Sequence, residues 1–414
     1  NRAINKITMG DGSVKFVEQN LLNTDLTLNL SQNIPWTGGS LFLETSAQRM
    51  DLFSEHKYSW QTSPIMIGYR QSLFGYNSLK WDKRIEPVRY QEAKKSYVET
   101  LELVSANAIN KFFALATAQS NYDIASFNYA NADTLYRYAQ GRYNIGTITE
   151  NEMLQLELNR LTEETNRMNA RIEMDNCMQE LRSYLGIQEE REIRVRVSSR
   201  IPDFSINLNE ALALAYENSP DIQTMKRRKL ESESAVARAR ANAGLKADIY
   251  LRFGLTQTAD KLPEAYRNLL DQQYVSLSIS LPILDWGRGK GQVRVARSNR
   301  DLVYTQVEQS RTDFELNVRK LVKQFNLQTQ RVRIAARIDE TAQRRNEVAR
   351  KLYILGKSTI LDLNASISEK DSARRNYVSA LYNYWSLYYT LRSMTLYDFE
   401  SNKLLTEDYN LLIE

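Results

Sequence analysis

The sequence repeats itself at one constant spacing. The tetrapeptide Tyr143–Gly146 returns as Tyr353–Gly356, 210 positions later (356 − 146), and Leu181-Arg182-Ser183 returns at the same spacing as Leu391-Arg392-Ser393. One spacing that joins separate landmarks indicates an internal duplication. We therefore expect two copies of one long structural unit, residues 1–206 and residues 207–414.

Each copy contains segments that alternate between apolar and polar residues. In 273–284, Val275, Leu277 and Ile279 alternate with serines, which places all apolar side chains on one face of a strand. We expect strands at about 24–50 and 64–75 in the first copy and at about 246–258 and 273–284 in the second. The polar stretches 51–63 and 259–272 are expected to be exposed loops. Segments of this kind are typical of outer-membrane barrels.

Very long helices follow the strands. The sequence predicts helices at about 84–140 and 149–185 in the first copy, and at about 208–243, 293–355 and 360–397 in the second, followed by a C-terminal tail. Residues 187–206 form a connector that contains Pro202. Helices near 55 residues would be roughly 80 Å long, so we expect them to pack as coiled coils. No counterpart of 208–243 is evident in the first copy; that helix is missing, replaced, or lies before residue 1.

Gly146 and Gly356 follow the longest helices. Glycine is the residue most easily accommodated in the left-handed conformation that ends a helix. Both positions are therefore expected to be turns of helical hairpins.

The composition narrows the possible functions. Apolar residues make up 42% of the 414 residues, the mean hydropathy is −0.52, and no window offers the roughly 18 apolar residues that a spanning helix needs. A membrane role would therefore rely on strands. The net charge of +5 comes from basic residues interleaved with acids, so no nucleic-acid partner is expected.

Catalysis is not expected. The chain has one His and one Cys, and Gly287–Gly291 lacks the spacing of a phosphate-binding loop. We predict no enzyme activity, cofactor or metal site. The first residues also lack the pattern of a secretory signal, which fits either a cytoplasmic protein or a processed chain.

Four amphipathic strands cannot seal themselves in a bilayer. Unpaired backbone groups at their edges would cost several kcal/mol each in hydrocarbon, and the smallest known barrels have about eight strands. Closure therefore requires further copies of the chain. Two copies would give about eight strands and a filled interior, whereas three would give about twelve and a wider, wet interior. The small serine faces favour three.

The chain resembles the TolC-like outer-membrane efflux proteins over nearly its full length. The resemblance rests on Leu281–Gly287 (LPILDWG), on Leu208–Pro220 (LNEALALAYENSP), and on the duplicated Tyr-x-x-Gly turn that precedes Asp362-Leu363. It implies a homotrimer with a 12-stranded barrel in the outer membrane of a Gram-negative bacterium, continued by a long α-helical barrel in the periplasm. It also implies a passive exit duct of a tripartite efflux or secretion system, which docks on a periplasmic adaptor and an inner-membrane transporter.

The same resemblance assigns roles near the two glycine turns. The periplasmic aperture would be formed by Glu152, Tyr353 and Asp362, with a Tyr353–Glu152 hydrogen bond and a ring of three Asp362 carboxylates that attracts cations. The alternative is that Glu152 and Asp362 are first-turn acids favoured by the helix dipole. The family's arginine and second aspartate near the second turn are Ser358 and Ala365 here.

Two further sets of residues complete the expected sites. The hairpin tips that contact the adaptor would be formed by Tyr143, Gly146, Gly356, Lys357 and Ser358. Aromatic residues that mark the periplasmic side of the bilayer would be Tyr76, Trp81 and Trp286, unless they only pack at the mouth of the barrel.

Two alternatives to an efflux duct stay open from the sequence. A type I protein-secretion duct would have the same fold, because the choice of cargo belongs mostly to the transporter. A soluble coiled-coil scaffold would explain the missing signal sequence, but it would leave the apolar strand faces exposed to water.

Overall fold

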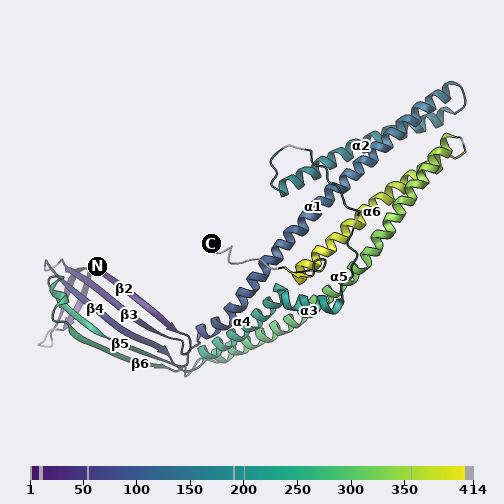
Figure 1. Ribbon diagram of the computed structural model, residues 1–414. Helices are drawn as coiled ribbons and strands as arrows, with labels where there is room; N and C mark the ends of the chain where they lie inside the picture. Colours follow the sequence, from purple (N-terminus) through teal and green to yellow (C-terminus); the bar gives the residue numbers. More distant parts are fainter. Residues whose placement is uncertain are drawn as a thin grey trace. The chain divides into compact units, whose positions relative to one another are not determined.

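The computed structural model describes residues 2–8, 13–53, 56–189, 192–199, 201–355 and 357–405. These residues form two compact units, each built from both copies of the repeat (Figure 1). The sheet unit comprises residues 1–90 and 224–308, and the helical unit comprises residues 91–223 and 309–414.

The sheet unit contains one six-stranded antiparallel sheet whose strands follow the chain order. Its strands are β1 (Arg2–Thr8), β2 (Val14–Ile34), β3 (Gly39–Leu52), β4 (Lys57–Ser72), β5 (Lys246–Ala259) and β6 (Leu270–Ser280). The hairpins β3–β4 and β5–β6 are the two copies of one element, since β5 less 210 falls at 36–49. Four strands were expected per protomer, and the described sheet has six, because the expected strand at 24–50 contains parts of both β2 and β3 and because β1 precedes it.

The expectation of a single strand at 24–50 is wrong. The chain turns back at 35–38, and β2 pairs with β3 from Leu21↔Leu52 to Ile34↔Gly39. Pro35 cannot donate to a ladder and Gly38 has a φ of +76°, so these residues form a turn instead of extended backbone.

β2 occupies the place where the duplication predicts a helix. The counterpart in the second copy is α4 (Pro220–Ala243), which maps to 10–33. Leu26, Leu28 and Leu30 alternate with Thr27 and Asn29, whereas α4 consists mostly of Ala and long charged residues. The first pattern favours a strand and the second a helix. In the described part of the first copy, the leading helix is therefore replaced.

Of the two polar stretches expected as loops, 51–63 is largely strand, whereas 259–272 is largely loop as expected. β3 continues to Leu52 and β4 begins at Lys57, while β5 continues to Ala259 and β6 begins at Leu270. Between β5 and β6 lies a short 3₁₀ helix, η1 (Glu264–Tyr266). The polar composition of 51–63 led to the loop prediction, but a strand that extends beyond a bilayer needs no apolar face. The strand expected to end at 284 stops at Ser280, just before Pro282.

The two longest helices have equal lengths. α1 (Ser78–Asn144) and α5 (Arg288–Ile354) each contain 67 residues, so each is about 100 Å long. They start earlier than the predicted residues 84 and 293, because Pro87 is tolerated inside α1 and two glycines are tolerated in the first turn of α5. Their hairpin partners are α2 (Glu150–Tyr184) and α6 (Ile360–Thr395), close to the predicted ranges.

The predicted single helix at 208–243 is interrupted. α3 (Leu208–Asn218) ends at Ser219, whose backbone is extended (φ −63°, ψ 136°), and α4 begins at Pro220. Proline disfavours helical backbone at the preceding residue and is well placed at the first position of a helix. The sequence Asn218-Ser219-Pro220 therefore ends one helix and starts another.

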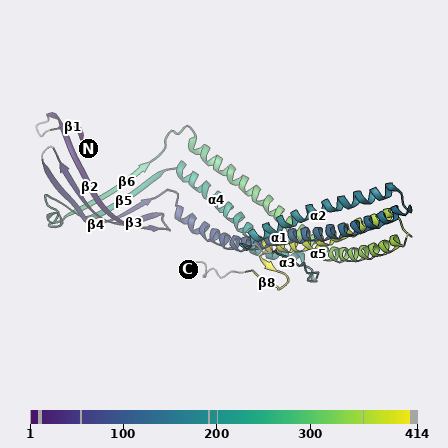
Figure 2. The ribbon, with the colours of Figure 1, turned by 90° about the horizontal axis from the view of Figure 1, so that it is seen from above.

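Aromatic residues form the densest packing of the helical unit. Phe325, Tyr384 and Tyr388 are almost fully buried, with ring centroids of Phe325 5.1 Å from Tyr384 and 5.9 Å from Tyr388. Figure 2 shows α1, α2, α5 and α6 running alongside one another. The short strands β7 (Tyr397–Asp398) and β8 (Lys403–Leu404) follow α6. Across the described residues, no helix combines the length and the apolar character that a bilayer crossing requires.

Candidate functional site

One face of the sheet is apolar and exposed. Leu30 pairs with Leu43, Leu43 with Ile67, and Ile67 with Phe253, so one row of apolar side chains crosses four strands. Members of this apolar face that are exposed by 41–77% are Leu26, Leu28, Leu30, Leu41, Leu43, Ile65, Ile67, Phe253, Val275, Leu277 and Ile279. So large a continuous apolar surface is unfavourable in water and marks a membrane or protein contact.

The opposite face is polar. It carries Asn29 and Ser31 on β2, Ser40 on β3, and Ser276 and Ser278 on β6. Strands that alternate apolar and polar residues in this way line the interior of a membrane barrel with the polar face. We call this surface the polar face below.

The predicted membrane-interface aromatics differ in their surroundings. Trp286 is 90% exposed and has a φ of +52°, in the segment between β6 and α5. The Tyr76 hydroxyl lies 2.5 Å from the Ser234 hydroxyl, and the Arg238 guanidinium lies 4.7 Å from the Tyr76 ring. Trp81 is half-buried beneath the Arg84 guanidinium at 4.7 Å. Trp286 thus suits a bilayer interface, whereas Tyr76 is packed against α4.

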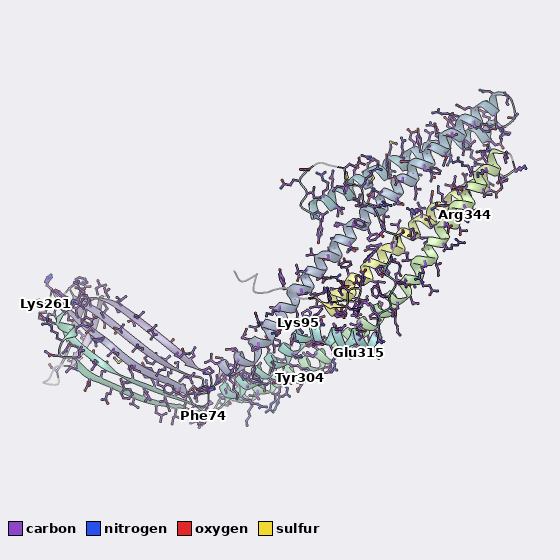
Figure 3. The ribbon with its side chains drawn as sticks, viewed as in Figure 1. Phe74, Lys95, Lys261, Tyr304, Glu315 and Arg344 are labelled. Carbon is purple, nitrogen blue, oxygen red and sulfur yellow. The ribbon has the colours of Figure 1, made fainter. Side chains whose placement is uncertain are left out.

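Other exposed aromatics at the same end of the sheet were not predicted. Trp36, in the β2–β3 turn, is 86% exposed, and Phe74, just after β4, is 54% exposed. The turn is held by two hydrogen bonds, from the Asn77 amide to the Pro35 carbonyl at 2.9 Å and from the Gln71 amide to the Thr37 carbonyl at 2.8 Å. Figure 3 shows Phe74 at this end of the sheet and Lys261 at the other.

The far end of the sheet has aromatics of its own. Arg49 lies over the rings of Tyr58 (5.0 Å) and Trp60 (5.7 Å) and pairs with Asp51 at 2.6 Å. The sequence analysis placed Trp60 in a loop. The alternation of Tyr58 and Trp60 on one strand face is the signal that could have placed them at a second interface.

The turn at Gly146 is a helix cap, as the sequence predicted. Gly146 has a φ of +73°, its amide donates to the Tyr143 carbonyl at 2.8 Å, and the Thr147 amide donates to the Arg142 carbonyl at 2.9 Å. These are the bonds of a Schellman cap. Tyr143 is 39% exposed at this turn.

A backbone hydrogen bond at the second turn matches one at the first turn. The Lys357 amide donates to the Leu352 carbonyl at 2.9 Å, which is the Thr147–Arg142 bond moved by 210 positions. Lys357 is exposed and Ser358 is partly buried. Gly356, predicted to cap this turn, lies outside the described residues.

Both predicted acids of the aperture take part in capping boxes. The Thr149 amide donates to the Glu152 carboxylate at 3.1 Å, and the Glu152 amide donates to the Thr149 hydroxyl at 3.3 Å. In the second copy, the Thr359 hydroxyl donates to Asp362 at 2.7 Å and the Ser358 hydroxyl at 3.3 Å. These caps satisfy amides at the starts of α2 and α6.

The hydrogen bonds at the second cap lower the pKa of Asp362, with the Thr359 hydroxyl as the largest cause. The first-turn role considered as the alternative is therefore present in the structure. The signal in the sequence was Thr-x-x-Glu in one copy and Thr-x-x-Asp in the other, which the analysis overlooked.

Tyr353 lies close to the opposite hairpin. Burial raises the pKa of the Tyr353 hydroxyl, the Arg142 charge opposes this rise, and the Glu152 charge adds to it. The Glu152 charge therefore acts on the pKa of Tyr353 within a single chain. In the part of the chain that the structure describes, no hydrogen bond joins the two residues, and the Glu152 carboxylate accepts from Thr149 instead.

Comparisons with known proteins agree with this geometry. The family described as outer membrane efflux protein matches residues 211–395. The outer membrane protein TolC of Escherichia coli is 21% identical over 311 residues, which cover 72% of this chain and 61% of TolC. The match thus spans about three fifths of the length of this relative.

Solved structures match almost the whole chain. The Campylobacter jejuni CmeC outer membrane channel has a TM-score of 0.67 at 15% identity, covering 95% of this chain and 80% of CmeC. The open state of the Neisseria gonorrhoeae MtrE outer membrane channel has a TM-score of 0.64 at 12% identity, covering 94% of this chain and 82% of MtrE. These proteins are described as channels and not as enzymes. Residues 211–395 therefore match the outer membrane efflux protein family, and the fold of the chain is similar to that of solved outer membrane channels.

Proposed function

We propose that the chain is one protomer of a homotrimeric channel that conducts substrates passively across the outer membrane. The channel acts as the exit duct of a tripartite efflux system, together with a periplasmic adaptor and an inner-membrane transporter. The names of the matched family and of the similar channels support this proposal.

The observation that carries the proposal is the open, two-faced sheet. Its apolar face is exposed over β2 to β6, its polar face is lined by small residues, and β1 and β6 each have one unpaired edge in a single chain. Backbone groups at such edges cost several kcal/mol each in hydrocarbon. Copies of the chain that join edge to edge would bury the edges and enclose the polar face.

The test is reconstitution in planar bilayers. The purified protein should need detergent for extraction, should run as three copies by light scattering corrected for detergent, and should give discrete conductance steps. A water-soluble monomer that leaves bilayer conductance unchanged would refute the proposal. The soluble-scaffold alternative predicts that result.

We further propose that Glu152, Tyr353 and Asp362 line the periplasmic aperture. The proximity of Tyr353 to the Glu152 charge supports the lock between hairpins, and the exposed Asp362 carboxylate supports the ring of three. Because the acids also serve as helix caps, substitutions there change both the turn and the aperture.

Tyr143 offers a matched control for Tyr353, since the two are repeat equivalents (353 − 143 = 210). Tyr353→Phe combined with Glu152→Ala should raise single-channel conductance, and Tyr143→Phe should not. Divalent cations on the periplasmic side should reduce the wild-type current and leave Asp362→Ala unaffected. Equal conductance in wild type and the double variant would refute the lock.

The hairpin tips are the proposed contact for the adaptor. Tyr143, Gly146, Gly356, Lys357 and Ser358 are the proposed contact residues. Of these, the structure describes Tyr143 and Gly146 at the first turn and Lys357 and Ser358 at the second, where the neighbouring Ile145 and Leu355 are 73% and 67% exposed. Exposed apolar residues at a turn are costly unless a partner covers them. Ile145→Ser with Leu355→Ser should abolish cross-linking to the adaptor while leaving bilayer conductance intact.

A further inference from the structure

A cluster of arginine and aromatic side chains lies on the polar face of the sheet. The strand register places Phe42, Gly68, Arg252 and Tyr274 in one cross-strand row, and Ser40, Arg70, Tyr250 and Ser276 in the next. All of these side chains lie opposite the apolar face, because residues paired across a ladder share a face.

The aromatic rings form a continuous stack. Phe42 and Tyr250 are stacked with centroids 5.8 Å apart and planes at 21°, and Tyr250 meets Tyr274 edge-on at 5.8 Å. Gly68 makes room for this stack, since a Cβ there would lie 2.0 Å from the Phe42 ring. The rings therefore extend from β3 to β6, with Phe42 buried at one end and the exposed Tyr274 and partly exposed Tyr250 offering apolar surface inside an otherwise polar face.

The two arginines beside the stack lack acidic partners. The Arg70 guanidinium lies 5.4 Å from the centre of the Tyr250 ring, and within the described residues neither Arg70 nor Arg252 forms an ion pair. The Arg252 Nε is shielded from solvent and has no hydrogen-bond partner. A shielded donor without an acceptor is costly, so it is a position where a ligand oxygen would be strongly favoured.

Acidic residues on the same face lie in the rows next to those of the arginines, but within the described residues no ion pair joins them to Arg70 or Arg252. Glu44 is in a separate row on β3 and accepts a hydrogen bond from the Asn29 amide at 3.4 Å, and Asp248 pairs in register with Ser278. The cluster therefore has a local positive charge beside an apolar surface. Guanidinium groups bind carboxylate, sulfonate and phosphate oxygens through paired donors, while aromatic rings stack on a flat ligand body.

We propose that Phe42, Arg70, Tyr250, Arg252 and Tyr274 form a binding site for aromatic organic anions on the interior wall of the channel. The site rests on the proposed channel function, because only a closed barrel puts the polar face on the substrate path. Three protomers would bring six arginines to one level of the barrel. The acidic aperture would favour cations at the periplasmic end of the channel. The arginine site would favour anions in the barrel, at the other end.

The test measures current block in reconstituted channels by a matched pair of probes, 2-naphthalenesulfonate and 2-naphthylmethylammonium. In wild type, the sulfonate should block at a lower concentration than the ammonium. Arg70→Gln with Arg252→Gln should raise the half-blocking concentration of the sulfonate at least tenfold, since each charge-assisted hydrogen bond contributes roughly one order of magnitude. The same variant should leave block by the ammonium unchanged or stronger.

Two further variants test whether the aromatic ring contributes to block by the sulfonate, and whether loss of an arginine elsewhere on the sheet has the same effect. Tyr250→Leu should weaken block by the sulfonate severalfold while leaving the permeability ratio of chloride to potassium unchanged. Arg49→Gln, on the apolar face and paired with Asp51, is the matched control and should change neither measurement.

The outcomes distinguish the two proposals. Protein that gives no conductance in any variant would refute the channel itself. Channels of normal conductance in which both probes block equally, or in which the double arginine variant keeps wild-type block by the sulfonate, would refute the binding site alone.

Discussion

The ion pair between Arg392 and Glu102 should stabilise the helical unit by an amount that thermal unfolding can measure. The Arg392 guanidinium binds the Glu102 carboxylate of α1 through two hydrogen bonds, Nε at 2.8 Å and Nη2 at 3.0 Å, and lies 3.4 Å from Asp398. The Arg392 and Glu102 side chains are 16% and 10% exposed. This pair fastens the end of α6 to the middle of α1.

Arg392→Ala would leave the Glu102 carboxylate nearly buried without its partner. Removal of one member of a buried ion pair costs roughly 3–5 kcal/mol, and the residual exposure favours the lower value, about 3 kcal/mol. For a unit of this size, each kcal/mol lowers the midpoint of thermal unfolding by roughly 2–4 °C. The expected fall is therefore about 6–12 °C.

The duplication supplies the control. Arg182 occupies the same Leu-Arg-Ser motif 210 positions earlier, but it donates to the Glu189 backbone carbonyl, and among the described residues no carboxylate pairs with it. Arg182→Ala should therefore lower the midpoint by less than about 4 °C, since contacts of this kind contribute about 1 kcal/mol.

The assay is circular dichroism of the helices in detergent, with every variant heated at one scan rate. The double variant Arg392→Met with Glu102→Leu should recover part of the loss, because the nearly buried Glu102 charge is removed together with its partner. Equal midpoints for Arg392→Ala and Arg182→Ala would show that the ion pair does not stabilise the unit, and the reasoning would fail.

Three further predictions concern turns and strands. Thr359→Ala should speed hydrogen exchange in the first turns of α6 about fivefold, the equivalent of about 1 kcal/mol for a lost cap. The pKa of Asp362 is lower in the folded than in the unfolded chain. Its contribution to protection against hydrogen exchange should therefore be complete above the unfolded pKa, about pH 4, and disappear as the pH falls through the folded pKa. The exchange rates are corrected for the intrinsic effect of pH. Gly68→Ala should impair folding of the barrel, measured by heat-modifiable migration in gels, and Phe42→Ala should rescue it by removing the ring in contact; lack of rescue would contradict that contact. Gly146→Ala should destabilise its turn by about 1 kcal/mol, seen as faster exchange there, because φ is +73° at this position.

The long-range architecture was predictable because its signals repeat. The long glycine-free stretches 84–140 and 293–355 and the alternating strands each occur in both copies, 210 residues apart, and α1 and α5 share one length. Gly146 was identified correctly since few residues other than glycine adopt its backbone angles easily.

The prediction failed where residues of a strand lack alternating apolar side chains. The residues around Trp60 are polar because the strand there extends past the apolar zone, so a search for apolar alternation missed it. The alternation of Leu26, Leu28 and Leu30 predicted the second half of β2 as strand, although the duplication would place a helix at the same positions. The cluster of arginine and aromatic side chains on the polar face could not be predicted, since it depends on the register that joins β3 to β6.

Because β2 replaces the helix that would be equivalent to α4 in the first copy, within the described part of the chain α4 alone contacts both α1 and α5 through Glu233. Glu233 of α4 accepts a hydrogen bond from the Tyr304 hydroxyl of α5 at 2.6 Å and also lies 3.9 Å from Arg84 of α1. A single helix thus ties together elements inherited from both halves of the ancestral duplication. Within the sheet unit, a shift of α1 or α5 would therefore be transmitted to the other helix through Glu233.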